Sequence, residues 1–183
     1  EQLQKYFPNL NAAARYCYKK EKYKEAMPYL RTCLDLPHTE LGQSAHLSTR
    51  GDEQNAIFYL ISAFCTKQYG EVTRYDSLAL SPVATRPTIM KYLSLTAEAE
   101  MDTTTYHRQL CEGWKAYPHD AFFFTRLADF YNCNKLFNQT LLLSAQQLKM
   151  DSTYTAAYMA QCVAHYELQQ YDSCIVSAQH TLA

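Results

Sequence analysis

Glycine and proline are scarce in this chain. Its 183 residues include four Gly and six Pro, the two residue types that most often mark turns. A β-sandwich or β-barrel needs a turn about every ten residues, so the chain has too few turn formers for either architecture. We therefore predict an all-α fold. A stack of small helical units would use a chain of this length as well as one compact core would.

An excess of charge of either sign is also missing. Seventeen Lys and Arg stand against eighteen Asp and Glu, which gives a formal net charge of −1. Because a nucleic-acid-binding surface shows a basic excess, we expect no nucleic-acid partner. No apolar run approaches the roughly 18 residues that a membrane-spanning helix needs, and the first residues, EQLQKYFP, do not form a signal peptide. We expect no membrane span.

Clustered cysteines are absent, although cysteine itself is not. The chain has seven Cys, no CxxC motif and no pattern of close spacing. Their density is below that of small disulfide-rich scaffolds, so we expect free thiols, and these favour a cytoplasmic location. An exported location stays open, because the chain begins at Glu1 and not at an initiator Met.

Helical segments follow one another in pairs joined by short polar turns. The first pair has an Ala-rich helix from about Pro8, a turn at KKEK and a second helix closed by Pro37. The second pair has the apolar helix NAIFYLISAFC and another helix that ends before Pro82. Between them, residues 38–52 break the pattern and are interpreted as an inserted loop with room for a helical turn. The predicted units form one domain over 1–183 and cover about 7–37, 53–82, 87–118, 121–152 and 155–183.

The last three units align at a period of 34 residues. One column holds Ser94, Ala128 and Cys162, and the column before it holds Leu93, Leu127 and Gln161. Thirty-four residues is the length of a tetratricopeptide repeat, and the chain resembles that family in four columns as well. The bulky fourth position is filled by Leu10, Met90, Phe124 and Tyr158, and the small eighth by Ala14, Ser94, Ala128 and Cys162. The aromatic seventeenth is filled by Tyr23, Phe137 and Tyr171, and the small twentieth by Ala26, Thr140 and Cys174, with Tyr106 as an exception.

This resemblance implies a right-handed α–α superhelix of about five helix-turn-helix units. Small side chains let the two helices of a unit approach closely, while the bulky and aromatic columns fill the space on either side. Three positions depart from the family pattern: Gln161 replaces the usual Leu, and Lys135 and Gln169 stand where the family usually has Gly in the turn. An irregular α-solenoid or helical bundle is the alternative architecture.

The column register also accounts for many of the cysteines. Cys162 and Cys174 stand in small columns and Cys17 and Cys33 in buried ones, so we interpret them as small apolar side chains.

Two pairs of side chains on one helix face are the candidates for a metal or nucleophilic site. They are His107 with Cys111, four residues apart, and Cys162 with His165, three apart. Each pair lacks a third ligating or orienting group nearby in the sequence. We therefore predict no catalytic residue, no metal, no cofactor and no enzymatic activity.

Three further polar features have ordinary explanations. Asp120, next to His119, is a good N-cap for the helix that follows. Asn138 begins an NQT triplet, the form of a glycosylation acceptor, but it lies at a predicted helix start. A basic segment is interleaved with Glu21 and Glu25, which is typical of a solvated helix face. That segment contains Arg15, Lys19, Lys20, Lys22 and Lys24.

The resemblance also implies a binding surface, the concave face that the first helix of each unit lines at positions two, five, nine, twelve and thirteen. In this sequence those positions are Asn11, Arg15, Tyr18, Lys19, Lys91, Glu98, Phe122, Thr125, Asp129, Asn132, Met159, Val163 and Tyr166. Such a surface runs from basic to apolar and suits a peptide with mixed side chains. One subfamily binds acidic C-terminal tails with Lys and Asn at positions five and nine of its first unit. Asn11 and Arg15 do not reproduce that clamp, so we expect no such partner.

Two hypotheses for the function follow. The first is a non-enzymatic scaffold that binds a peptide or a partner protein in the concave groove. The second is a sensor or regulatory region of a longer protein, with an effector domain outside this sequence. The final helix, CIVSAQHTLA, is apolar on more than one side, so we expect further chain or self-association to cover it.

Overall fold

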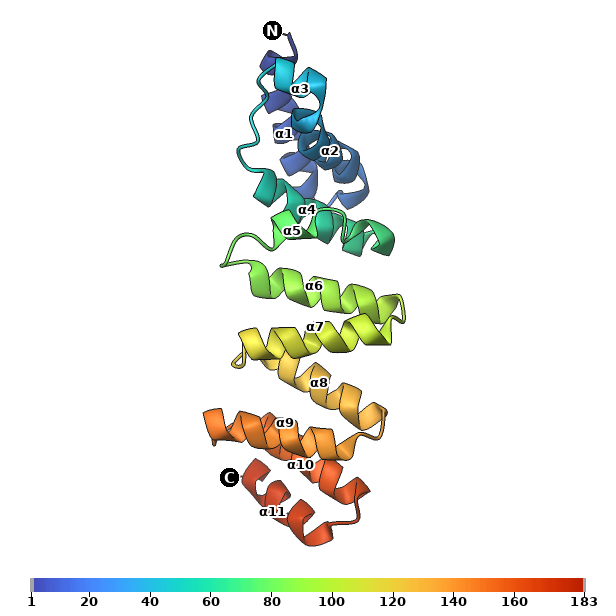
Figure 1. Ribbon diagram of the computed structural model, residues 1–183, viewed down its shortest axis with the longest axis vertical. Coiled ribbons are helices and arrows are strands. Elements are labelled where there is room, and N and C mark those ends of the chain that lie inside the picture. The colour runs from blue at the N-terminus through green and yellow to red at the C-terminus, as the bar shows by residue number, and fades with distance from the viewer. Residues whose placement is uncertain (1, 183) are drawn as a thin grey trace. The chain divides into compact units, whose positions relative to one another are not determined.

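The chain is entirely helical over the residues that the computed structural model describes, 2–182 (Figure 1). Eleven α-helices and two short 3-10 helices follow one another, and no strand occurs within these residues. The elements are α1 (Gln2–Lys19), α2 (Tyr23–Asp35), η1 (Leu36–His38), α3 (Glu40–Ser44), α4 (Asp52–Cys65), η2 (Tyr69–Glu71), α5 (Asp76–Ala79), α6 (Arg86–Ala99), α7 (Thr103–Ala116), α8 (Ala121–Cys133), α9 (Phe137–Met150), α10 (Thr155–Glu167) and α11 (Tyr171–Leu182). The all-α prediction is confirmed. No helix among residues 2–182 is both long and apolar enough to cross a bilayer.

The structure divides into two compact parts. The N-terminal half extends to Tyr106 and the C-terminal half begins at His107, so the division falls inside the third predicted repeat, 87–118. Within each half, successive helices lie side by side, as α1 does with α2 and α10 with α11 (Figure 1). The single domain predicted over residues 1–183 stays a prediction.

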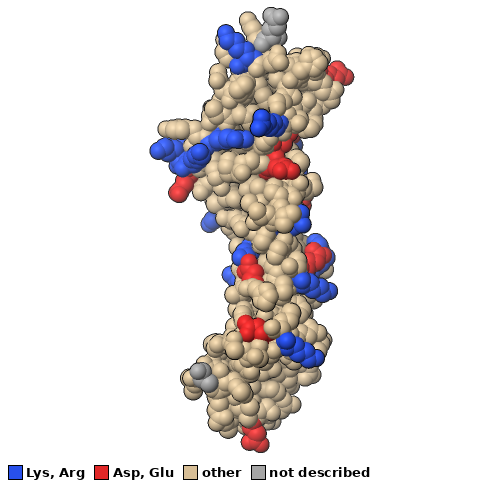
Figure 2. Space-filling view, turned by 90° about the vertical axis from the view of Figure 1, so that its left-hand side faces the viewer, with Lys and Arg blue, Asp and Glu red and all other residues tan. Residues whose placement is uncertain are grey.

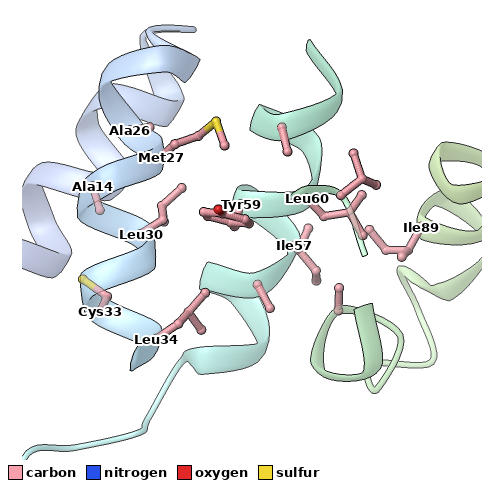
Figure 3. Packing of buried hydrophobic residues seen from close by; sticks show 14 of the residues in the cluster. Ala14, Ala26, Met27, Leu30, Cys33, Leu34, Ile57, Tyr59, Leu60 and Ile89 are labelled. Atoms are coloured by element: carbon pink, nitrogen blue, oxygen red, sulfur yellow. The ribbon is translucent and has the colours of Figure 1, made fainter. Parts of the chain in front are cut away.

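The core of the N-terminal half lies between α1, α2 and α4 and extends to α6. Leu30 and Leu34 of α2 and Tyr59 and Leu60 of α4 are almost completely buried there. Figure 3 shows Tyr59 pointing toward α2 and Leu60 pointing to the other side of α4. Ile89 of α6 closes the cluster on the far side of α4. Each helix buries one side of its surface against its neighbours, as expected for stacked amphipathic helices.

The small columns lie at the helix crossings, as the register predicts. Ala14 and Ala26 are fully buried between α1 and α2, and Ala128 and Thr140 are buried in the pair formed by α8 and α9. Tyr106, the exception in its column, is buried as well. Glycine serves the same purpose at Gly113 of α7, where a Cβ atom would lie 2.2 Å from the ring of Phe123 in α8. Only a residue without a side chain fits this contact.

The left-handed turn residue recurs at the predicted period. Lys67, Met101, Lys135 and Gln169 have φ between 58° and 60°, and each stands 34 residues after the one before it. Glu21, with φ 58°, is the fifth member and precedes Lys67 by 46 residues, because the inserted segment lies between them. These turns therefore adopt the left-handed conformation that usually favours Gly, although the residue at that position is not Gly in any of them.

Two helix predictions were wrong. The second helix of the second unit does not form as one element, because η2 and the four-residue α5 take its place. Thr73, Asp76 and Ser77 are weak helix formers, and Pro82 disfavours helix at the residue before it. The segment is held instead by tertiary contacts, including a 2.6 Å hydrogen bond from the Tyr75 hydroxyl to Asp35 Oδ1.

The first helix also begins earlier than predicted. It starts at Gln2 and carries Pro8 in its interior, not in its first turn. Burial of Phe7 supplies the contact that extends the helix in this direction. The inserted segment 38–52 contains one short helix, α3, which confirms the expected helical turn.

Candidate functional site

A cleft between α8 and α10 brings together the residues that the register assigns to the concave face of the C-terminal half. Its volume is about 270 Å³. The lining residues are Phe124, Thr125, Ala128, Asp129, Asn132, Ala156, Met159, Ala160 and Val163. Thr125, Asp129, Asn132, Met159 and Val163 were all predicted as partner-binding positions. They meet because side chains spaced three or four residues apart share one helix face.

The cleft has an apolar floor and a single charge at its edge. Phe124, Ala128 and Ala160 are buried beneath it. Met159 and Val163 are 56% and 47% exposed, although both are apolar. Asp129 is the one titratable side chain among the lining residues, and its exposed carboxylate makes no hydrogen bond or ion pair with residues 2–182.

The two neutral polar side chains of the cleft are tied to their own surroundings. The Thr125 hydroxyl donates to the carbonyl oxygen of Ala121 at 2.7 Å, within α8. The amide oxygen of Asn132 accepts a 2.7 Å hydrogen bond from the Thr140 hydroxyl of α9. These bonds hold both groups in place while the acceptor lone pairs of Thr125 and the amide nitrogen of Asn132 stay available.

Sequence reasoning missed the residues that shape the cleft floor. Phe124 and Ala128 were assigned to packing, and Ala156 and Ala160 were assigned no role. The signal for them is the small side chain at 156 and 160, because two alanines on α10 leave space that larger residues would fill.

Two predicted binding residues of this half lie outside the cleft lining. Phe122 packs edge-on against Phe123, with ring centroids 5.3 Å apart, and lies beneath the Arg126 guanidinium. Tyr166 is exposed and contacts the ring of Tyr171 edge-on, with 6.1 Å between the centroids. Their role in binding stays a prediction.

In the N-terminal half, two of the four predicted residues of α1 contact α4. Asn11 Oδ1 accepts a 2.8 Å hydrogen bond from Asn55 Nδ2. Tyr18 stacks on Phe58 with centroids 3.9 Å apart, and burial raises the pKa of its hydroxyl to about 12. Arg15 is half-buried and Lys19 is exposed. Two of these four side chains therefore stabilise a helix contact.

The remaining predicted residues of this half lie on α6. Lys91 is half-buried, and Glu98 accepts a 3.4 Å hydrogen bond from the Tyr106 hydroxyl. Lys and Arg side chains gather on one face of the N-terminal half, whereas the C-terminal end of the chain shows few charged side chains in the same view (Figure 2).

His107 and Cys111 meet on one face of α7, and α8 adds a third group, the Tyr131 hydroxyl, which spacing along one helix does not indicate. The distance from Cys111 Sγ to His107 Nε2 is 3.4 Å, and from His107 Nε2 to the Tyr131 hydroxyl 3.2 Å. Burial and the neighbouring Cys111 raise the pKa of Tyr131 to about 12. The His107 ring also stacks on Phe130, with centroids 5.0 Å apart. The cluster is packed in the interface between the two helices.

The two members of the second candidate pair, Cys162 and His165, each contact another residue. His165 Nδ1 lies 2.7 Å from Gln170 Oε1, and the sulfur of Cys162 contacts Cys174 of α11 at 3.3 Å. The hydrogen bond with Cys174 and burial raise the pKa of the Cys162 thiol. No group of three or more His, Cys, Asp and Glu side chains within residues 2–182 is arranged to hold a metal ion.

Two smaller predictions also concern this half. The N-cap is confirmed, because the Asp120 side chain accepts a 3.1 Å hydrogen bond from the backbone N–H of Phe122. Ile175, Val176 and Leu182 of α11 are exposed, so this helix does present apolar side chains to solvent. Self-association through this helix stays a prediction.

Comparison with known proteins shows similarity of fold without similarity of sequence. No protein-family model matches the chain, and no curated protein matches it by sequence. Among solved structures, MamA from AMB-1 superposes with a TM-score of 0.65 at 12% identity, over 96% of this chain and 89% of that one. A second crystal form of it gives a TM-score of 0.59 at 13% identity, over 99% and 98%. MamA from MSR-1 gives 0.55 at 15% identity, over 99% and 94%. MamA is a tetratricopeptide-like helical repeat protein, so the chain has the fold of such repeats.

Proposed function

We propose that this protein is a non-enzymatic scaffold that holds a peptide segment of a partner protein in the cleft between α8 and α10. The observation that carries the proposal is the cleft itself, in which predicted binding residues from two separate repeats line one cavity. The similarity of fold to a helical repeat protein supports it, because such repeats present extended binding surfaces.

The lining residues favour a peptide with one apolar side chain next to a basic one. Met159 and Val163 offer exposed apolar surface, which a partner's apolar side chain would remove from water. Asp129 adds a carboxylate that can accept hydrogen bonds from Lys or Arg, or from backbone N–H groups. Since no other lining residue is charged, a Lys or Arg of the peptide would pair with Asp129.

The chemistry of the cleft argues against a catalytic pocket. Its volume of about 270 Å³ is close to the lower end of the range of about 300–1,000 Å³ that is usual for small-ligand sites. A side chain or two of a peptide fits such a space. General acid–base catalysis needs positioned groups that exchange protons, and Asp129 is the single titratable group in the lining. We assign no reaction to the cleft.

A peptide-display screen tests this function. Immobilised protein should enrich peptides in which an apolar residue neighbours Lys or Arg, and a synthetic peptide of that consensus should bind in a fluorescence-polarisation titration. Asp129→Asn, which removes the charge and keeps the shape, should weaken binding about ten-fold or more, as expected for losing one charge-assisted hydrogen bond.

Asp172→Asn is the matched control, because Asp172 is an exposed carboxylate on α11 that does not line the cleft. It should leave the affinity unchanged. Equal affinities for wild type and both variants would refute the role of the cleft. Met159→Gln tests the apolar contact independently of the charge, since it replaces exposed apolar surface with a polar side chain of similar length.

A further inference from the structure

The sulfur atoms of Cys162 and Cys174 are in contact. Cys162 lies on α10 and Cys174 on α11, and their Sγ atoms are 3.3 Å apart. Both side chains are half-buried, so neither is sealed from solvent. Among the cysteines that the structure describes, no other two sulfurs are paired in this way.

The repeat geometry explains why these two positions meet. They occupy the eighth and twentieth columns, which hold Ala14 and Ala26 in the first repeat, where the helices cross closely enough to bury both residues completely. In the last repeat the same crossing carries two thiols. The ring of Tyr158 stacks on His180 at 4.7 Å and fixes α10 against α11 at a second point. The contact therefore follows from the backbone of the repeat and not from one flexible side chain.

A disulfide bond at this position requires a small movement. A disulfide has an S–S length of about 2.05 Å, so the two sulfurs must approach by about 1.3 Å from their 3.3 Å separation. Rotation about the Cα–Cβ bonds can supply this, because the two helices already lie at contact distance.

We propose that Cys162 and Cys174 form a redox-active dithiol that a low-molecular-weight disulfide oxidises to an intramolecular disulfide. The thiolate of one cysteine attacks a sulfur of the small disulfide, forms a mixed disulfide and releases one thiolate, which takes up a proton. The thiolate of the second cysteine then attacks the sulfur of the first and releases the other thiol. The protein loses two protons and two electrons, and the small disulfide becomes two thiols.

The bond changes what holds the last repeat together. It joins α10 directly to α11 across the turn at Gln169. Since α10 also carries Met159 and Val163, which line the cleft, the cross-link fixes the helix that forms one wall of the cleft. The proposal itself does not depend on peptide binding, because the thiol contact exists without it.

Thiol counting and peptide mapping test the proposal on the whole protein. After incubation with oxidised glutathione and removal of the reagent, the denatured chain should show five free thiols in place of seven. A glutamate-specific protease cuts after Glu167, between the two cysteines. The fragments that carry Cys162 and Cys174 should then stay joined until dithiothreitol separates them.

Three variants complete the test. Cys162→Ser and Cys174→Ser should each prevent the linked fragments, whereas Cys133→Ser, at an exposed cysteine outside the pair, should leave them in place. Seven remaining thiols in the wild type, thiols lost as separate glutathione adducts, or a disulfide between other cysteines would each overturn the proposal. Because the decisive mapping is done on the wild type, a folding defect in a variant does not affect the outcome.

Discussion

Trp114 and Gln147 are joined by a hydrogen bond in the interior of the C-terminal half. The indole Nε1–H of Trp114 donates to Gln147 Oε1 at 2.8 Å, and Gln147 Nε2 donates to the carbonyl oxygen of Pro118 at 3.0 Å. Gln147 is 0% exposed. One buried amide thus links α7, α9 and the connection before α8, with both its donor and its acceptor in use.

We expect Gln147→Leu to lower the free energy of unfolding by about 2–4 kcal/mol, because it leaves the Trp114 N–H and the Pro118 carbonyl without partners. Gln146→Leu is the matched control at an exposed position of the same helix, and it should change stability by less than about 0.5 kcal/mol. Urea unfolding followed by the fluorescence of Trp114, the one tryptophan of the chain, measures both. Equal losses would contradict the bridge.

The seam between α8 and α9 gives a second prediction. Ala128 is buried there, so Ala128→Leu inserts a branched side chain into a filled space and should cost about 1–3 kcal/mol. Ala145→Leu makes the same change at an exposed position of α9 and should be nearly neutral, because Leu and Ala have similar helix propensities. Thermal melting of both variants decides the matter: a similar melting temperature for the two would show that Ala128 is not at the crossing.

The repeat period was the part of the fold that could be predicted most reliably from the sequence. Side chains of fixed size must recur wherever the same two helices cross, so the 34-residue period places Ser94, Ala128 and Thr140 in small columns, where all three are buried. The extent of individual helices was less accessible. Short elements such as α5 depend on distant contacts, among them the hydrogen bond between Tyr75 and Asp35, and local composition does not contain such contacts.

The sequence predicted several residues that line the cleft, but it did not predict that a cleft exists between the two helices. Helix periodicity places Asp129 and Val163 on the correct faces, and both line the cleft. Whether space remains between two helices depends on small residues such as Ala156, which cannot be distinguished in the sequence from residues of an ordinary packed core. The contact between Cys162 and Cys174 shows the same limit, since the register assigned both to small columns and spacing along one helix pointed instead to His165.

A buried hydroxyl connects stability to pH in the N-terminal half. Tyr59 donates a 2.6 Å hydrogen bond to Glu71 Oε2, and this bond is the main cause that lowers the pKa of the Glu71 carboxyl. A lowered folded-state pKa adds stability above the unfolded pKa, and this stability is lost as the pH falls through the folded pKa.

Tyr59→Phe should therefore reduce the free energy of unfolding by about 1 kcal/mol at neutral pH, and the difference from wild type should shrink below a pH of about 4. Tyr29→Phe, at an exposed tyrosine, should behave as wild type at every pH. Chemical unfolding across a pH series provides the measurement, and a difference that does not change with pH would mean that Glu71 is not the partner.

At the turn between α10 and α11, a substitution to Gly is expected to raise stability, whereas the same substitution inside a helix is expected to lower it. Gln169 has φ 60°, a conformation that costs a residue with a side chain about 1–2 kcal/mol. Gln169→Gly removes that cost and adds about 0.5–1 kcal/mol of chain entropy to the unfolded state. A net gain in stability of about 0.5–1 kcal/mol should result from the difference. Gln146→Gly, inside α9, should instead lose about 1 kcal/mol. If both variants lose stability in the same denaturant titration, the left-handed turn at Gln169 is not under strain.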